Sequence, residues 1–288
     1  MWMNCRRSAE SCFSARVFCH RAKSYKSGMN TKPVSFTIAT FNMRRDVFFD
    51  GRNRWKYRYP AIAEYIRHSG IDIIGTQELT SVMKGELAAL LPGYTFIGHG
   101  RSRRLGGEHT DIIVRDDCAS LCCENSFWLS KRPDRPGSRA LFAMLPRICT
   151  VAELKLHSSG QRIRVFNTHF DHLSRSAKML GIRVLLRFLR EADERETLPT
   201  VITGDLNFSP TSKMTDMLCR GVFGLRSAFD GDEGTLNFFR HGSCTYRCDH
   251  IFISGEFIIQ KAYIDRFLPD GRLLSDHYPL VASLAVGA

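Results

Sequence analysis

The sequence lacks three features, and each absence excludes a class of protein. No run approaches the ~18–20 consecutive apolar residues that a membrane-spanning helix requires. None of the 10 cysteines forms a Cys-Xaa-Xaa-Cys pair, so the spacing typical of structural zinc sites is missing. There is no Gly-Xaa-Ser-Xaa-Gly nucleophile elbow either. We therefore expect a soluble protein without a membrane partner, whose cysteines are free thiols in a reducing compartment.

Acidic residues are also scarce. The chain has 29 Asp and Glu against 41 Lys and Arg, which gives a formal net charge of +12. Residues 1–28 hold six basic residues and one glutamate, so +5 lies there and +7 remains for residues 29–288. A basic balance favours an anionic partner, although it identifies neither the substrate nor its affinity.

Residues 1–28 are rich in Ser and Arg, poor in acids, and without the apolar centre of a secretory signal. This composition is typical of an organelle transit peptide. A disordered tail, or an extension upstream of a start at Met29, explains it more simply. We predict a disordered or targeting-like extension over residues 1–30 and a single domain over residues 31–288. The predicted location is cytoplasmic, in preference to an organelle.

Apolar, β-branched runs recur at the spacing of strands. They lie at 34–41, 71–75, 94–98, 111–114, 148–156, 162–168, 199–203, 249–253, 257–264 and 279–285. Helical patterns are fewer, and lie at 60–70, 81–91, 174–195 (after Ser174 as N-cap) and 211–219. This excess of strands predicts an α/β fold in which two packed sheets are covered by helices.

Polar side chains stand at the end or edge of several apolar runs. They are Asn42 in IATFN, Glu78 in IDIIGTQE, His169 in RVFNTHFDH, Asp205 and Asn207 in VITGDLN, Asp249 in RCDHIFIS, and Asp276 and His277 in SDHYPL. Strand ends in such sheets meet along a common rim, so these side chains are expected to converge. Carboxylates and carboxamides supply the oxygen ligands that Mg²⁺ or Mn²⁺ prefers.

The order of these residues resembles that of the endonuclease/exonuclease/phosphatase superfamily. Its members include DNase I-like nucleases, abasic-site endonucleases, deadenylases, sphingomyelinases and inositol polyphosphate 5-phosphatases. The resemblance covers about residues 34–286. Motifs at 42–46, 107–108, 127–130 and 146–150 resemble a bacterial branch without an assigned substrate, although Val151 replaces its usual Trp. The resemblance implies a four-layer α/β/β/α sandwich of two mixed sheets flanked by helices.

The resemblance also implies which residues would hold metal and activate water. Glu78 would ligate Mg²⁺, with Asn42 beside it completing or orienting the ligands. Asp276 would bind a second metal ion or reach one through water. Asp205 would position and deprotonate the attacking water, while Asn207 would orient the scissile phosphate.

Two histidines would stabilise the phosphoryl oxygens in this scheme. Asp249 would hydrogen-bond His277 and hold it charged, because a neighbouring carboxylate raises the pKa of an imidazole. His277 would then stabilise negative charge that develops on a phosphoryl oxygen, and His169 would contribute from the opposite side. Such positioning and charge neutralisation suffice for phosphoryl transfer without a covalent nucleophile.

Other polar residues near these motifs have strong structural interpretations. His250 is expected to be packed or solvated, and Asp171 and His172 are weaker candidates than the eight residues above. Arg44 and Asp46 would either tether the loop after Asn42 or meet substrate. The arginines at 44–58 and 101–104 would form a phosphate-binding wall or, more commonly, a solvated face. Metal contact by Cys244 or Cys248 is the less favoured interpretation.

Three functions remain open. The leading prediction is a Mg²⁺-dependent phosphodiesterase or nuclease acting on nucleic acid or a nucleotide-like ester. A phosphomonoesterase acting on small anionic substrates such as inositol phosphates is second, since GDLNF at 204–208 and CDHI at 248–251 match the 5-phosphatase motifs only in part. A non-catalytic phosphate-ligand binding module is third, because no key residue is missing. Oligomeric state is not predicted.

Overall fold

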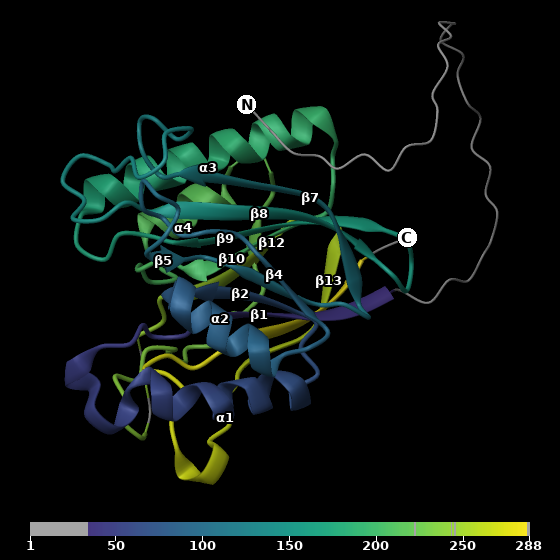
Figure 1. Ribbon diagram of the computed structural model, residues 1–288. Helices are drawn as coiled ribbons and strands as arrows, with labels where there is room; N and C mark the ends of the chain where they lie inside the picture. Colours follow the sequence, from purple (N-terminus) through teal and green to yellow (C-terminus); the bar gives the residue numbers. More distant parts are fainter. Residues whose placement is uncertain (1–33, 222, 243, 245, 287–288) are drawn as a thin grey trace, which may run out of the picture.

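Two six-stranded sheets, packed face to face, form the centre of the computed structural model (Figure 1). It describes residues 34–221, 223–242, 244 and 246–286, so the extension predicted over residues 1–30 lies outside the described residues. The first sheet contains, in spatial order, β13 (Phe257–Ile264), β14 (Leu280–Val286), β1 (Val34–Asn42), β2 (Ile73–Gln77), β6 (Ile112–Arg115) and β4 (Tyr94–Ile97).

The second sheet has the same number of strands. In spatial order they are β11 (Arg226–Ser227), β12 (Asp249–Ile253), β10 (Thr200–Asp205), β9 (Arg162–His169), β8 (Ile148–Leu156) and β7 (Ala119–Trp128). Both sheets are mixed: β1 and β2 pair in parallel, as do β9 and β10, and the other neighbours are antiparallel. A small separate sheet pairs β3 (Leu79–Thr80) with β5 (Glu108–His109).

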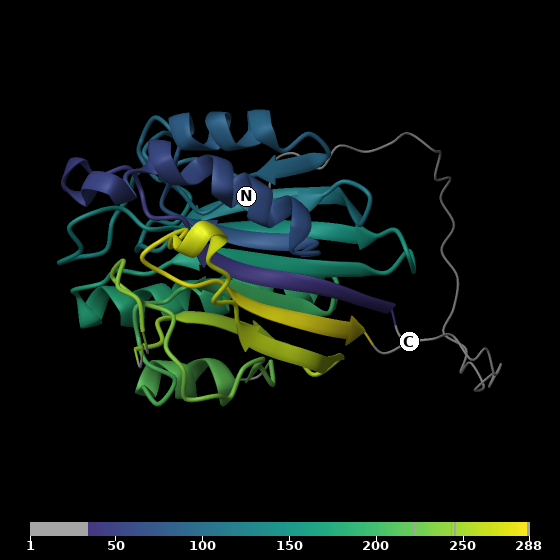
Figure 2. The same ribbon diagram turned by 90° about the horizontal axis from the view of Figure 1, so that it is seen from below.

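Helices cover the outer face of each sheet, as the two views show (Figures 1 and 2). The first sheet carries α1 (Trp55–His68) and α2 (Ser81–Leu90), and the second carries α3 (Arg175–Arg195) and α4 (Lys213–Cys219). Two short 3₁₀ helices, η1 (Phe48–Asn53) and η2 (Pro269–Gly271), lie in loops. The predicted four-layer α/β/β/α sandwich is therefore confirmed.

Three apolar clusters separate the four layers. On β1, Phe36 and Ile38 face the second sheet and join a cluster with Val165 and Val201. The alternate residues of the strands face outward, because successive side chains point to opposite faces. Those of the first sheet pack on Ile62 of α1 and its neighbours, and those of the second sheet pack on α3 and α4.

The inward-facing rows change from apolar to polar toward one end of the sandwich. On β1, Phe36 and Ile38 give way to Thr40 and Asn42, and equivalent changes occur on β2, β9 and β10. Gln77 on β2 donates across the sheets to Asn167 Oδ1 on β9 at 2.8 Å. This polar layer forms the floor beneath the site residues, which lie at the same strand ends.

The sequence prediction missed one long strand and the beginning of one helix. β7 is an edge strand with many partly exposed polar residues, so it carries too little apolar pattern to predict. α1 begins at Trp55, five residues before the predicted start at Pro60. Its first turn is stabilised because Asp46 Oδ1 accepts a hydrogen bond from the Trp55 backbone N–H at 3.1 Å.

Two further expectations concern cysteines and membranes. Free thiols are confirmed for Cys118, Cys149, Cys219, Cys244 and Cys248. Within the part of the chain that the structure describes, no helix has the length and apolar character to cross a membrane.

Candidate active site

Strand register places three of the predicted residues side by side at the end of the second sheet. Asp205, the last residue of β10, pairs with His169 at the end of β9 and with Asp249 at the start of β12. All three side chains are at least nine-tenths buried. Their approach is therefore a direct result of how three sheet neighbours align.

The first sheet contributes Asn42 and Glu78 from the facing side. Asn42 ends β1 beside Gln77, and Glu78 directly follows Gln77. Asn42 Nδ2 donates to Glu78 Oε1 at 3.1 Å and to Asp205 Oδ2 at 3.0 Å. Its Oδ1 accepts from the Arg44 backbone N–H at 3.0 Å. In this arrangement Asn42 bridges the carboxylates of the two sheets.

Glu78 remains a carboxylate in spite of its burial. Burial alone would raise the pKa of Glu78, but hydrogen bonds from the Arg45 backbone and Asn42 outweigh it and lower the pKa below its ordinary value. Glu78 also has a positive φ of 65°, a conformation that non-glycine residues seldom adopt. Strain of this kind concentrates at functional sites, where the surrounding structure holds it in place.

One oxygen of Asp205 faces three polar groups at once. Its Oδ2 lies 3.0 Å from Asn42 Nδ2, 3.6 Å from His169 Nε2 and 3.9 Å from His277 Nε2. Burial, with the nearby charge of Asp249, raises the pKa of Asp205 to about 7. A carboxyl group with this pKa can exchange protons near neutral pH, as a general base must.

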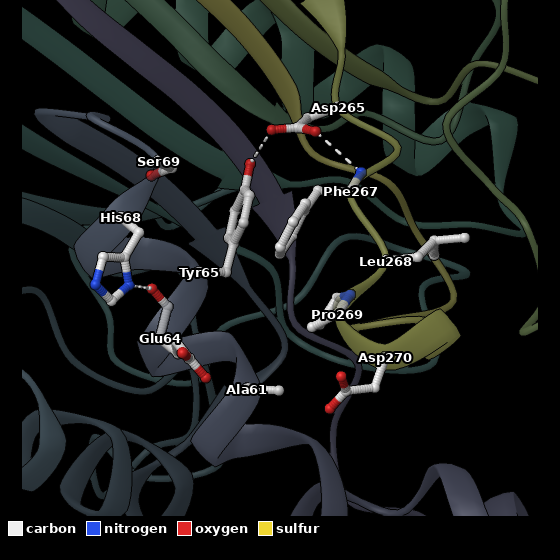
Figure 3. Close-up of a pocket in the computed structure, with 10 residues that line it drawn as sticks. All are labelled: Ala61, Glu64, Tyr65, His68, Ser69, Asp265, Phe267, Leu268, Pro269 and Asp270. Atoms are coloured by element: carbon white, nitrogen blue, oxygen red, sulfur yellow. Dashed lines mark hydrogen bonds between the residues drawn. The ribbon is translucent and has the colours of Figure 1, made fainter.

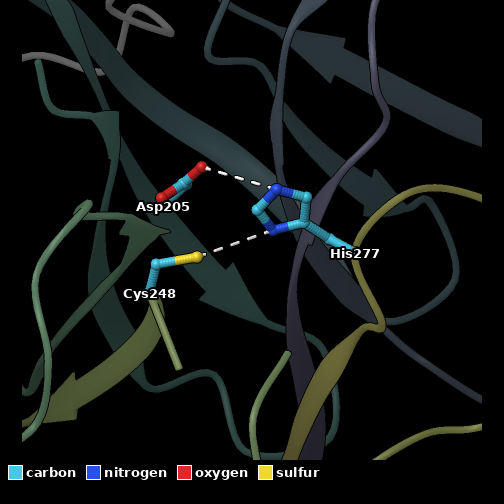
Figure 4. A group of neighbouring side chains, drawn as sticks. All are labelled: Asp205, Cys248 and His277. Atoms are coloured by element: carbon cyan, nitrogen blue, oxygen red, sulfur yellow. Dashed lines mark hydrogen bonds and ion pairs between the residues drawn. The ribbon is translucent and has the colours of Figure 1, made fainter. Parts of the chain in front are cut away.

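His277 and Asp249 form a buried ion pair. Asp249 Oδ2 lies 2.8 Å from His277 Nδ1. Burial opposes the charged imidazole, but the Asp249 carboxylate outweighs it, and the pKa of His277 is raised well above its ordinary value. The second oxygen, Asp249 Oδ1, is buried without a hydrogen-bond partner. The charged imidazole presents Nε2 toward Asp205 (Figure 4).

The second imidazole has the opposite protonation. Burial, followed by the guanidinium groups of Arg147 and Arg101, lowers the pKa of His169 well below its ordinary value. A neutral His169 can donate an N–H hydrogen bond but carries no charge. The two histidines on either side of Asp205 therefore differ in what they can supply.

Asn207 and Asp276 complete the predicted set. Asn207 has a positive φ of 54°, and its Nδ2 donates to Phe170 O at 3.1 Å. Asp276 Oδ1 accepts from Ser275 Oγ at 3.3 Å, and Oδ2 pairs with Arg44 Nη1 at 3.5 Å. Burial raises the pKa of Asp276, and Glu78 is among the charges acting on it. The eight predicted residues thus lie in one interconnected group.

The structure assigns packing roles to several weaker candidates. His250 stacks on Phe252 and lies tilted against Phe208, and its Nε2 lies 2.8 Å from Phe208 O. Asp171 accepts from the backbone N–H groups of Leu173 and Ser174. Asp46 binds Arg54 through both carboxylate oxygens, at 3.1 and 2.5 Å. These contacts shape the loops around the site.

Two basic residues near His169 received no firm role from the sequence. Arg147 immediately precedes β8, and Arg101 lies in the loop after β4; both residues are buried. Together with His169 they line a small pocket, and Arg147 Nε and Nη1 have no hydrogen-bond partner. The position of Arg147 could have been predicted from the strand pattern. Because β8 is antiparallel to β9, the residue before β8 lies at the rim where β9 ends.

Lys178 was missed as well. It projects from α3, and its Nζ donates to Asn207 O at 2.7 Å and to His172 O at 3.3 Å. It thereby fixes the loop that carries Asn207. Its position on an otherwise amphipathic helix gave no sign of this contact.

The pocket in Figure 3 lies away from this site. It is formed by α1 and the segment after β13, and includes Tyr65, Asp265 and Phe267. Tyr65 Oη donates to Asp265 Oδ2 at 2.8 Å, and its ring stacks on Phe267. None of the eight predicted site residues lines it. We therefore base the assignment of function on the residues at the strand ends and not on this pocket.

The chain belongs to the endonuclease/exonuclease/phosphatase family. The model of this family matches residues 39–277. No curated protein sequence matches the chain. Members of the family are phosphoester hydrolases, and this protein is accordingly an enzyme of that class.

Several solved structures are similar over nearly the whole chain. A family member from Bacteroides thetaiotaomicron is 31% identical, with a TM-score of 0.82, and covers 90% of this chain and 100% of its own. One from Bacteroides vulgatus is 30% identical, with a TM-score of 0.82, and covers 88% and 100%. A mannosyl-6-phosphatase from Bacteroides thetaiotaomicron is 32% identical, with a TM-score of 0.78, and covers 86% and 99%.

The donors at the rim fit the divalent metal ion that enzymes of this family typically use. Glu78, Asn42 and Asp276 offer oxygen atoms, which suit a hard cation such as Mg²⁺. A second group of donors is different in kind. It consists of Asp205, Cys248 and His277, whose potential ligand atoms all lie within 4.8 Å of one another.

Proposed function

We propose that this protein is a Mg²⁺-dependent phosphodiesterase that cleaves nucleic acid or a nucleotide-like ester by in-line attack of water. The observation that carries the proposal is the environment of Asp205 Oδ2, which faces Asn42, His169 and His277. A buried carboxylate with a pKa of about 7 is suited to accept a proton from water. Mn²⁺ is the alternative metal.

Each remaining residue has a distinct role in this proposal. Glu78 would hold the metal, Asn42 would orient Glu78 against Asp205, and Asp276 would bind a second ion directly or through water. When bound, the metal supplies positive charge to the phosphoryl oxygens. Asn207 would orient the scissile phosphate. The deprotonated Asp205 would accept the proton of the attacking water.

The two histidines would act on the phosphoryl oxygens. His277, held charged by Asp249, would stabilise negative charge as the bond to the leaving oxygen lengthens. His169 would donate a neutral hydrogen bond from the other side of Asp205. The positively charged and neutral imidazoles thus supply different kinds of stabilisation to one phosphoryl group.

Basic residues around the rim support a substrate with more than one phosphate. Arg147 and Arg101 lie beside His169, and Arg147 has two unpartnered nitrogens. The loop between β7 and β8 and the loop after β4 form a second pocket that is rich in cations. Its basic residues are Arg103, Lys131, Arg132, Arg135 and Arg139. Such a series of charges suits a polyanion that extends beyond the scissile bond.

Hydrolysis of a small phosphomonoester is the second candidate. The observation that favours it is the relative described as a mannosyl-6-phosphatase, which is 32% identical to this chain. The same rim residues would serve either reaction, because both require attack of water on phosphorus. The choice between them therefore depends on the loops that surround the rim.

A substrate panel tests the proposal. The full chain with Mg²⁺ is assayed on single- and double-stranded DNA, RNA, dinucleotides, mannose 6-phosphate and inositol phosphates. Asp205→Asn should reduce turnover by about 10²–10⁴-fold, because it removes the general base. The matched control is Asp216→Asn, which changes an exposed aspartate on α4.

The outcomes separate the candidates. Polynucleotide cleavage that is lost in Asp205→Asn and kept in Asp216→Asn supports the phosphodiesterase. Phosphate release from small monoesters alone would replace it with the second candidate. Wild-type turnover in a folded Asp205→Asn protein would remove Asp205 from the mechanism.

A further inference from the structure

Cys248 brings a sulfur atom to the proposed catalytic residues. It immediately precedes β12 and is almost completely buried. Its Sγ lies 3.8 Å from His277 Nδ1 and 3.6 Å from Asp249 Oδ2. Figure 4 shows the thiol directed at one ring nitrogen of His277 and the Asp205 carboxylate directed at the other. The mechanism above gives this thiol no task.

Cys248, Asp205 and His277 match the ligand types of a zinc site. One atom from each residue can be chosen so that all three lie within 4.8 Å of one another, and all three residues are buried. In a tetrahedral zinc site with Zn–S about 2.3 Å and Zn–N about 2.0 Å, ligand atoms are about 3.3–3.6 Å apart. His277 Nε2 and Asp205 Oδ2 are already only 3.9 Å apart. Cys248 Sγ now faces Nδ1 of the same ring, so rotation of the Cys248 side chain would have to bring the sulfur to an ion bound at Nε2.

Asp249 supplies the outer support that such a histidine ligand needs. Its carboxylate holds His277 Nδ1 at 2.8 Å, which leaves Nε2 as the ligating nitrogen. Metal-binding histidines commonly have a carboxylate on the nitrogen that does not bind metal, because it fixes the ring and increases its basicity. The fourth position of the tetrahedron would remain for water or a phosphoryl oxygen.

The donor chemistry distinguishes this group from the proposed Mg²⁺ ligands. Glu78, Asn42 and Asp276 offer oxygen alone, whereas Cys248 offers sulfur, and its thiol must lose a proton when it binds metal. Thiolate and imidazole select Zn²⁺ or Cd²⁺ and bind Mg²⁺ poorly. The two sets of ligands therefore differ in the class of cation that they favour.

We propose that Asp205, Cys248 and His277 form a binding site for a thiophilic divalent cation such as Zn²⁺, and that its occupation inhibits hydrolysis. An ion held by Asp205 and His277 would occupy the proposed general base and the imidazole that faces the phosphoryl oxygen. The inhibitory half of this inference rests on the proposed function. The binding half depends only on the three side chains.

Binding is tested without any substrate. The full chain, with Mg²⁺ in excess, is titrated with Cd²⁺ while the ultraviolet absorption of the Cd–thiolate bond is recorded. Other cysteines contribute to the signal, so the quantity of interest is the difference between wild type and Cys248→Ser. Cys219→Ser, on α4, is the matched control for loss of one half-buried thiol. Loss of one tight-binding step in Cys248→Ser alone is expected.

Inhibition is tested at fixed saturating Mg²⁺. The apparent inhibition constant for Zn²⁺ should rise at least about tenfold in Cys248→Ser, as expected when support for a bound metal is removed, and should not change in Cys219→Ser. Turnover of each variant is first measured without Zn²⁺, and inhibition is expressed relative to that value. Thermal melting of Cys248→Ser, with Cys248→Ala as a second variant, verifies that the fold is retained.

Each outcome supports or overturns either the binding half or the inhibitory half of the proposal. An unchanged Cd²⁺ titration in Cys248→Ser would overturn the site itself. A missing Cd²⁺ step combined with unchanged Zn²⁺ inhibition would show that Zn²⁺ acts elsewhere, for example by replacing Mg²⁺ at Glu78, and would overturn the inhibitory half. If no phosphoester is hydrolysed, the proposed function fails while the Cd²⁺ titration still decides whether the site exists.

Discussion

Asp249 acts on two groups of opposite charge through one carboxylate. Its negative charge disfavours the ionised form of Asp205 and favours the charged form of His277. The pKa values of both neighbours are therefore raised by the same residue. This coupling gives the pH dependence of the enzyme a definite sign.

The rate should fall on both sides of an optimum. Asp205 must be deprotonated to accept a proton, so kcat/KM should decrease as the pH falls through about 7, the value to which the pKa of Asp205 is raised. A bound divalent cation favours the carboxylate and moves this acidic limb to lower pH. His277 must be charged, so the basic limb should lie well above the ordinary pKa range of histidine.

Asp249→Asn should move both limbs to lower pH, because it removes the charge that raises both pKa values. The measurement is the pH profile of kcat/KM at saturating metal. Conversion of the exposed Asp216 to Asn is the control and should leave the limbs in place. Limbs that stay fixed in Asp249→Asn would contradict the assignment of Asp205 and His277 to them.

Glu78→Gln should raise the Mg²⁺ concentration required for half-maximal activity by at least about tenfold, since a carboxylate ligand is replaced by a neutral amide. Titration of activity with Mg²⁺ measures this. Glu64→Gln on α1, which lines the pocket of Figure 3, is the matched control. An unchanged metal requirement would place the ligand elsewhere.

The predictability of the site differs from residue to residue. The eight residues were predicted by their motif positions, and the structure brings them together. The hydrogen bonds of Asn42 were not predictable, because its Nδ2 reaches Glu78 and Asp205, which are 36 and 163 residues away in the sequence. Metal contact by Cys248 was the less favoured interpretation because its spacing from Cys244 is not that of a zinc motif, and its neighbours Asp205 and His277 are distant in the sequence. Their approach is a property of the folded sheets.

At the scale of the elements, the two sheets approach closely where Gly75 lies on β2. A Cβ atom at this position would be 2.1 Å from Thr203 Oγ1 and 2.6 Å from Asn167 Oδ1, both on the opposite sheet. Real atoms do not approach so closely, and therefore the Thr203 and Asn167 side chains, or the strands that carry them, would have to shift. Gly75 thus permits the contact that holds β2 against β9 and β10 beneath the site.

Gly75→Ala should destabilise the fold by about 1–3 kcal/mol, the usual cost of overpacking a well-packed interior. Urea denaturation gives the free energy of unfolding. Gly85→Ala on α2 is the control, because its Cβ would meet no atom within 4 Å. That change should stabilise the helix by about 0.5–1 kcal/mol. Equal stability of the two variants would contradict the close sheet contact.

Elements with a strong apolar period were predictable, and elements shaped by distant partners were not. The spacing of apolar residues in α3 and its N-cap Ser174 could be predicted from the sequence. In the structure, Ser174 Oγ accepts a hydrogen bond from the Ala177 N–H. β7 could not, because an edge strand is exposed and tolerates polar residues. The early start of α1 depends on Asp46, which lies outside the helix.

At the scale of the whole molecule, the structure shows where part of the positive net charge lies. The net charge of +7 outside residues 1–28 is not informative by itself. Five basic residues nevertheless line one pocket between the loop after β4 and the loop from β7 to β8. These loops leave the strand ends on the side of Arg101 and Arg147, so the charge is placed where an extended substrate would continue.

This placement predicts a salt dependence that differs between substrates. Between about 50 and 200 mM salt, kcat/KM for a polynucleotide should fall steeply, because each phosphate contact releases counterions. The value for a dinucleotide should fall much less. A triple variant, Arg132→Gln with Arg135→Gln and Arg139→Gln, should weaken polynucleotide cleavage and reduce its salt slope by about one for each phosphate that is no longer neutralised, while dinucleotide cleavage stays near wild type.

The matched control removes the same charge elsewhere. Arg183, Arg187 and Arg190 are exposed on α3, and their conversion to Gln should leave the salt slope nearly unchanged if the pocket contacts substrate. Equal effects of the two triple variants would mean that only the net charge matters. If neither variant affects polynucleotides and small monoesters are cleaved faster, the basic pocket has no part in substrate binding, and the phosphomonoesterase becomes the better description of this enzyme.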